Sequence, residues 1–82
     1  MSVISSPGLR TFIRKSQVRQ QYREFLRLVK LAPSSFRQEL RDCIRSEFQK
    51  HSLETRDDHI AFLLAEGRKR LLDLEKYLKL TR

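Results

Sequence analysis

The sequence predicts an all-α protein, an antiparallel up-down-up bundle of three helices. Apolar residues recur at steps of three and four along most of the chain, and no segment is a candidate strand. Short breaks at residues 32–34 and 51–54 divide this pattern into three parts. Connections this short force successive helices to be antiparallel neighbours. With 82 residues, the chain has room for one small domain.

The first helix is expected from Leu9 or Thr11 to Leu31. A breaker cluster at residues 5–8 precedes it, and Pro33 ends it because proline lacks an N–H donor and restricts the residue before it. Apolar residues at a spacing near 3.6 mark its buried face: Phe12, Val18, Tyr22, Phe25, Leu26 and Val29.

The second helix is expected from Ser35 to about Lys50. Ser35 and Gln38 have the spacing of a capping box, in which each side chain satisfies a free N–H group at the helix start. The apolar face of this helix contains Phe36, Leu40, Cys43, Ile44 and Phe48.

The third helix should be the longest. Thr55 is the candidate cap, and Asp57 and Asp58 lie near the positive end of the helix dipole. The apolar seam that follows is Ile60, Leu63, Leu64, Gly67, Leu71, Leu74 and Leu78. A glycine inside a helix costs about 1 kcal/mol relative to alanine. Gly67 therefore indicates either close helix packing or room for a ligand between the helices.

The chain is strongly basic. Eighteen Lys and Arg oppose ten Asp and Glu, which gives a net charge of +8 and favours polyanions or an acidic protein face as partners. No acid precedes Glu24, so the start of the chain resembles a mitochondrial targeting segment, with a basic first helix as the alternative. We divide the chain into a basic N-terminal arm or targeting-like segment, residues 1–10, and a three-helix domain, residues 11–82.

Several function classes have little support. Cys43 is the sole cysteine and is expected to be a small core residue; with His51 and His59 it makes no convincing metal set. A Cys and His pair would be the enzymatic alternative, but a core thiol and surface imidazoles are far commoner, so we expect no enzyme. No apolar run approaches the roughly 20 residues that span a bilayer, so we expect no transmembrane segment.

Two sets of cations recur at steps of four and should each lie along one face of a helix. The first basic ridge is Lys15, Arg19, Arg23 and Arg27, beside Tyr22, and the second basic ridge is Arg37, Arg41 and Arg45. Like charges at this spacing disfavour an isolated helix by a few tenths of a kcal/mol per pair, so an acidic partner would compensate them. The alternative is an ordinary solvated face.

Four features follow one another along the chain: Tyr22-Arg23 within residues 18–26, Pro33, Arg45-x-x-Phe48, and residues 60–67 ending in Gly67. Together they resemble the mitochondrial LYR-motif family, also called complex 1 LYR-like. The similarity extends over roughly residues 9–80. One departure is Gln21, which stands where the motif has leucine. A glutamine there is expected to weaken a contact with the core or a bound lipid, or to face solvent instead.

The resemblance implies a non-catalytic adaptor that binds the mitochondrial acyl carrier protein. The carrier's 4′-phosphopantetheine arm would deliver an acyl chain into the bundle, so this protein needs no cofactor of its own. The resemblance implies that Tyr22 and the two basic ridges bind the carrier. It also implies that the acyl chain is lined by Phe25, Leu26, Leu40, Ile44, Phe48, Leu63, Leu64, Gly67 and Leu71. Tyr22 is expected to face the entry point of the arm.

The same resemblance implies a place in the mitochondrial matrix, or on the matrix side of the inner membrane, docked on a larger complex. Respiratory complex I is the expected client, with mitochondrial ribosome or iron-sulfur assembly as alternatives within the family. Two alternatives come from the residues themselves. The net charge with interleaved aromatic residues would suit a nucleic-acid-binding domain. The first dozen residues would suit an amphipathic helix on a membrane surface, since Phe12 and Ile13 are flanked by arginine.

Overall fold

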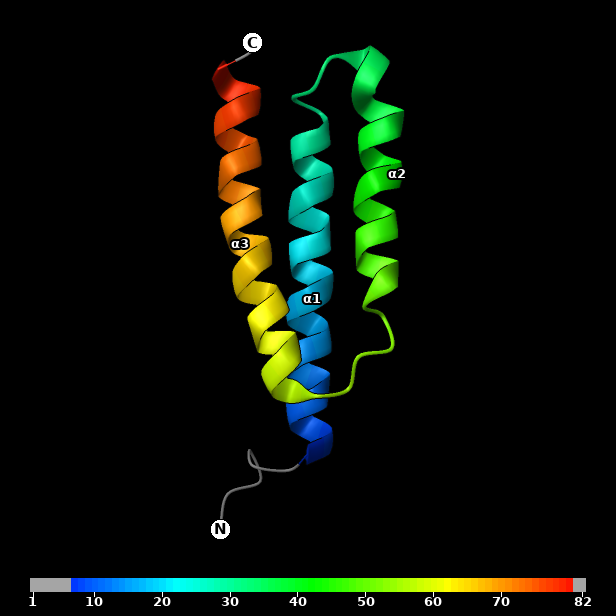
Figure 1. Cartoon of the computed structure of the whole chain (residues 1–82), viewed down its shortest axis with the longest axis vertical. Helices are drawn as coiled ribbons and strands as arrows, with labels where there is room; N and C mark the ends of the chain where they lie inside the picture. Colours follow the sequence, from blue (N-terminus) through cyan, green and yellow to red (C-terminus); the bar gives the residue numbers. More distant parts are fainter. Residues whose placement is uncertain (1–6, 81–82) are drawn as a thin grey trace.

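The computed structural model describes residues 7–80, and within this range it contains three α-helices and no strand. The helices are α1 (Pro7–Val29), α2 (Ser34–Lys50) and α3 (Asp57–Leu80). The all-α prediction is confirmed. Figure 1 shows α1 between α2 and α3, with α1 and α3 running in one direction and α2 in the other, an arrangement compatible with the predicted bundle. The molecule is a rod of 52 × 21 × 16 Å. None of the described helices has both the length and the apolar composition needed to cross a membrane.

The prediction that α1 begins at Leu9 or Thr11 was wrong, because the helix already begins at Pro7. Proline is tolerated in the first turn, where its missing N–H would have had no partner inside the helix. Residues 7–10 of the expected arm are therefore helical, and its residues 1–6 lie outside the described part of the chain.

The prediction of a capping box at the start of α2 was also wrong. Pro33 occupies the cap position, no side chain caps the helix, and Ser35 is already inside it. Instead, a side chain inside α2 reaches back to the connection that precedes the helix. Arg37 Nε donates to the Ala32 carbonyl at 3.0 Å, and its Nη2 donates to the Lys30 carbonyl at 3.1 Å. These bonds satisfy carbonyl groups that follow the C-terminus of α1, where helical partners run out.

The cap predicted for α3 was wrong as well. The Glu54 carboxylate, rather than the Thr55 hydroxyl, accepts hydrogen bonds from the backbone N–H groups of Thr55 and Arg56, at 3.1 and 2.9 Å. Asp57 and Asp58 do lie in the first turn of α3, as predicted, where carboxylates stabilise the helix dipole.

The core is small because the three helices pack unequally. Its buried apolar residues are Val29, Ala32, Ile44, Ile60 and Leu78. Helix α1 packs against both neighbours, whereas the Cα atoms of α2 and α3 stay more than 8 Å apart throughout the described residues. Much of the predicted apolar seam is consequently only half-buried.

Three residues of the predicted apolar faces are exposed, contrary to expectation. Phe12 and Phe36 keep 63% and 58% of their surface accessible, and Cys43 is exposed rather than part of the core. Phe12 precedes the first tie between α1 and α3, at Arg14, so it has no third helix to pack against. Phe36 and Cys43 are on α2, whose Cα atoms stay more than 8 Å from those of α3.

Candidate functional site

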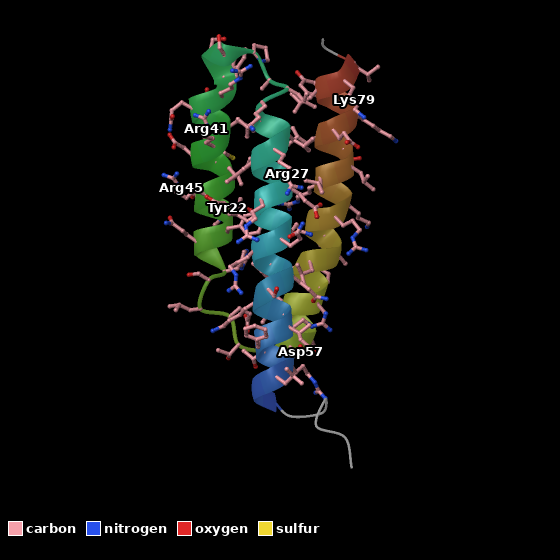
Figure 2. All side chains as sticks on the ribbon, turned by 180° about the vertical axis from the view of Figure 1, so that it is seen from behind. Tyr22, Arg27, Arg41, Arg45, Asp57 and Lys79 are labelled. Atoms are coloured by element: carbon pink, nitrogen blue, oxygen red, sulfur yellow. The ribbon has the colours of Figure 1, made fainter. Side chains whose placement is uncertain are left out.

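Tyr22 lies at the junction of α1 and α2, where Figure 2 shows it between the two helices. Its ring meets Phe48 edge-on with centroids 5.1 Å apart, and Phe25 meets the same ring at 5.8 Å. Edge-to-face pairs of this kind contribute about 0.5–1.5 kcal/mol each beyond the area they bury. Phe48 therefore joins α2 to α1. Since Tyr22 and Phe25 already pack on it, they are poorly placed to stack on nucleic-acid bases.

The first basic ridge consists entirely of exposed side chains. Within the described part of the chain, no ion pair or side-chain hydrogen bond engages any of its four members, Lys15, Arg19, Arg23 and Arg27. Three of the cations on α3 differ, since Lys69, Arg70 and Lys79 each lie within 4.0 Å of a glutamate oxygen, at 3.9, 3.5 and 3.7 Å. The described residues therefore leave most of the positive charge of α1 without an acidic partner.

The second basic ridge is not uniform. Arg41 and Arg45 are exposed on α2, and Figure 2 shows both in the same view as Tyr22 and Arg27. Arg41 donates only to the Gln38 amide oxygen at 3.2 Å, and Arg45 makes no ion pair within residues 7–80. Arg37 is half-buried and its guanidinium is occupied by the two carbonyls that follow α1. Its position therefore fits a structural role better than a free docking cation.

The predicted lining residues come from all three helices. Among them only Ile44 is buried. The others are half-buried: Phe25, Leu26, Leu40, Phe48, Leu63, Leu64, Gly67 and Leu71. Apolar side chains that stay half-exposed forgo part of the burial energy they could contribute, about 25 cal/mol per Å². The interior can therefore gain stability by covering them.

Gln21 and Gly67 form one contact between α1 and α3. Gln21 is 9% exposed, and its Nε2 donates to the Leu64 carbonyl at 2.9 Å. A Cβ on Gly67 would overlap the Gln21 side-chain carbonyl oxygen. The expectation that Gln21 might face solvent was therefore wrong, and close packing accounts for the glycine. The signal was visible in the sequence as two residues unusual for their positions, but nothing there paired them.

The contact between Gln21 and Gly67 joins α1 to α3, whereas the aromatic junction of Tyr22, Phe25 and Phe48 joins α1 to α2. Arg14 Nε and Asp57 Oδ1 are 2.9 Å apart, and this pair, like Gln21 and Leu64, is separated by 43 residues. Equal separations mean that α1 and α3 run parallel in constant register. A groove on this seam shares Leu64 and Leu71 with the predicted lining and contains none of the basic-ridge residues; its wall is otherwise Arg14, Ser16, Gln17, Gln20, Gln21, Glu24, Ala61, Ala65 and Arg68.

The two histidines lie around the α2–α3 connection. His59 Nδ1 is 2.6 Å from Glu54 Oε2, the His51 ring meets His59 edge-on, and His59 stacks on Phe62. Hydrogen bonds from the Arg56 backbone and from His59 lower the pKa of Glu54 below its usual value. Among the described residues, no three Cys, His, Asp or Glu side chains are grouped so that they could hold a metal ion. The arrangement thus stabilises the start of α3.

Comparisons with known proteins agree on one family. The family model described as Complex 1 protein (LYR family) matches residues 16–72. LYR motif-containing protein 2 of Rattus norvegicus is 37% identical over 75 residues, which cover 90% of this chain and 85% of that protein. LYR motif-containing protein 2 of Homo sapiens is 35% identical over the same length and coverage. No solved structure matches. The resemblance inferred from the motif blocks is confirmed, and the chain belongs to the Complex 1 protein (LYR) family.

Proposed function

We propose that this protein is a non-catalytic mitochondrial adaptor that binds the acylated mitochondrial acyl carrier protein and attaches it to respiratory complex I. The observation that carries the proposal is the positive charge beside Tyr22, which has no ion-pair partner among the described residues, together with lining residues that are mostly only half-buried. Membership of the Complex 1 protein (LYR) family supports both the mitochondrial setting and the client.

Charge supports an acidic protein as the partner. The chain carries a net charge of +8, and the exposed cations of the first basic ridge have no acid within the described residues. An acidic carrier would supply the missing negative charge, accelerate encounter by long-range attraction and fix the orientation of docking. Arg23 on α1 and Arg45 on α2 are expected to contact it on the two sides of Tyr22, with Arg41 beside them.

The half-buried interior supports an acyl chain as the ligand. Each methylene group moved out of water contributes about 0.8 kcal/mol, so a long chain supplies on the order of 8 kcal/mol before ordering costs. The chain and its 4′-phosphopantetheine arm belong to the carrier. Phe48 is the residue of the predicted lining that stands next to Tyr22, so it would contact the chain close to where the arm enters.

Co-expression with the mitochondrial acyl carrier protein tests this function. The purified complex should contain both proteins in equal amounts, and the intact mass of the carrier should include the arm and a fatty acyl chain. Recovery of this protein without a carrier, or with a carrier that lacks an acyl group, would contradict the proposal.

Charge reversal tests the docking surface. Arg23→Glu and Arg45→Glu should each weaken carrier binding by more than about tenfold, because like charges brought together cost several kcal/mol. Lys76→Glu is the matched control, since Lys76 is also exposed and unpaired among the described residues but lies on α3. Equal losses for all three variants would show that only net charge matters.

The client requires a separate measurement. Affinity purification from mitochondria followed by mass spectrometry should recover complex I subunits together with the carrier. Recovery of ribosomal or iron-sulfur assembly proteins instead would contradict complex I as the client and would leave the proposed carrier binding unaffected.

A further inference from the structure

One end of the rod presents large apolar side chains to solvent. Figure 1 shows that the start of α1 and the α2–α3 connection lie at this end, and that α1 reaches past the connection. Phe12 and Ile13 on α1 are 63% and 41% exposed, and Leu53 in the connection is 90% exposed. Phe62, in the second turn of α3, is 58% exposed. Two separate chain segments thus place apolar groups at the same end.

The exposure of Phe12 and Ile13 follows from the lengths of the helices. Arg14 pairs with Asp57, and Asp57 is the first residue of α3. The turns of α1 before Arg14 therefore have no third helix beside them. Packing among residues 7–80 leaves these two side chains uncovered.

The uncompensated charge at this end is positive. Arg10 and Lys15 are exposed and have no ion pair within residues 7–80. The nearby acids are already engaged: Asp57 with Arg14 at 2.9 Å, Asp58 with Arg56 at 3.0 Å and Glu54 with His59 at 2.6 Å. A partner that approaches this end therefore meets free cations beside apolar side chains.

We infer that this end of the molecule binds the surface of an anionic lipid bilayer. Phe12 and Ile13 enter the boundary between headgroups and acyl chains, Leu53 makes a second contact, and Arg10 and Lys15 attract lipid phosphates. The apolar groups come from a helix end and from a loop that are far apart in the sequence. A fluid bilayer accommodates such side chains without needing a complementary shape.

This orientation leaves most of the carrier-binding surface free. Arg23 and Arg27 lie further along α1, and Arg41 and Arg45 lie on α2. None of the described helices is long and apolar enough to span a bilayer, and the proposed contact is with the bilayer surface. The protein would hold a bound partner beside the bilayer rather than within it.

Vesicle pelleting with the full chain tests the inference. The protein should pellet with vesicles of phosphatidylcholine and phosphatidylglycerol, and less with vesicles of phosphatidylcholine alone. Phe12→Ser with Ile13→Ser should weaken binding by at least about tenfold, given about 1.5–3 kcal/mol for burying a large apolar side chain. Arg10→Gln should weaken it about fivefold, the effect of about 1 kcal/mol per cation near the surface.

The matched control is Leu72→Ser with Tyr77→Ser, which removes two exposed apolar side chains from α3 away from this end. It should leave vesicle binding unchanged, and circular dichroism should show the same helix content for every variant. The inference is overturned by three results: no pelleting with phosphatidylglycerol, equal pelleting with neutral vesicles, or equal losses in the control. It is also overturned if Phe12→Ser with Ile13→Ser weakens capture of the carrier but not pelleting, since this end would then bind protein.

Discussion

Replacing Gly67 by alanine should destabilise this protein even though alanine is the better helix former. In an open helix interior, Gly→Ala gains about 1 kcal/mol. At this position the new methyl group would overlap the Gln21 side-chain carbonyl oxygen, so the buried amide has to move. The expected sign of the change is therefore opposite to that of the helix propensity.

The magnitude follows from what the Gln21 side chain loses. Moving it breaks the 2.9 Å hydrogen bond from Nε2 to the Leu64 carbonyl, and a buried polar group left unpaired costs about 1–3 kcal/mol. Crowding a packed seam adds about 1 kcal/mol, the low end for overpacking, because the amide is at the end of a flexible side chain. After the propensity gain, the net loss is about 2 kcal/mol.

Thermal and urea unfolding followed by circular dichroism measure this loss. A domain of this size loses about 4–8 °C in Tm per kcal/mol, so Gly67→Ala should lower Tm by about 8–16 °C. Gly8→Ala is the matched control, the same change at an exposed helical position, and it should be neutral or stabilising.

A double-mutant cycle isolates the cause. In a Gln21→Ala background the amide is gone, so Gly67→Ala should become stabilising by up to about 1 kcal/mol. Stabilisation of the unmodified protein by Gly67→Ala, or equal destabilisation in both backgrounds, would contradict a clash between the new methyl group and the Gln21 amide.

Two further predictions concern the aromatic junction and the start of α3. Phe48→Ala should lower the free energy of unfolding by about 3 kcal/mol, because it removes both ring contacts between α2 and α1. The control is Phe36→Ala at an exposed position of α2, which should change the free energy of unfolding by less than about 0.5 kcal/mol. Similar losses for the two variants would contradict the role of Phe48. Glu54 has a lowered pKa, chiefly through the backbone N–H of Arg56, so its stabilising effect is present above its ordinary pKa of 4.5 and is lost as pH falls through the lower folded value. Urea unfolding across this acidic range should show a shallower pH dependence for Glu54→Gln than for the unmodified protein, and identical slopes would sink this explanation.

The fold class could be predicted because local rules govern it. Apolar spacing near 3.6, the break at Pro33 and the acids at 57–58 placed three helices within a few residues of their bounds. The errors were at helix starts, at Pro7, Ser35 and Thr55. There, several polar or restricted residues compete for the same free N–H groups, and the winner depends on side-chain geometry.

Burial was less predictable than helix position. Periodicity identifies which face of a helix is apolar, but it does not say whether a neighbour covers that face. Phe12 is uncovered because α1 extends beyond α3, and Cys43 is exposed on α2, which stays apart from α3. Spacing also failed to show which predicted docking cations are free. Arg37 has the same spacing as Arg41 and Arg45, yet its guanidinium donates to two backbone carbonyls.

The order of residues was enough to indicate three helices, a basic first helix and membership of the LYR family, because these depend on spacing and composition along the chain. The tertiary structure alone paired Gln21 with Gly67, joined Tyr22 and Phe25 through Phe48, and kept the Cα atoms of α2 and α3 more than 8 Å apart. Each of these depends on side chains from different helices meeting at short range. Such meetings are set by the packing of the helices against one another, which no single segment encodes.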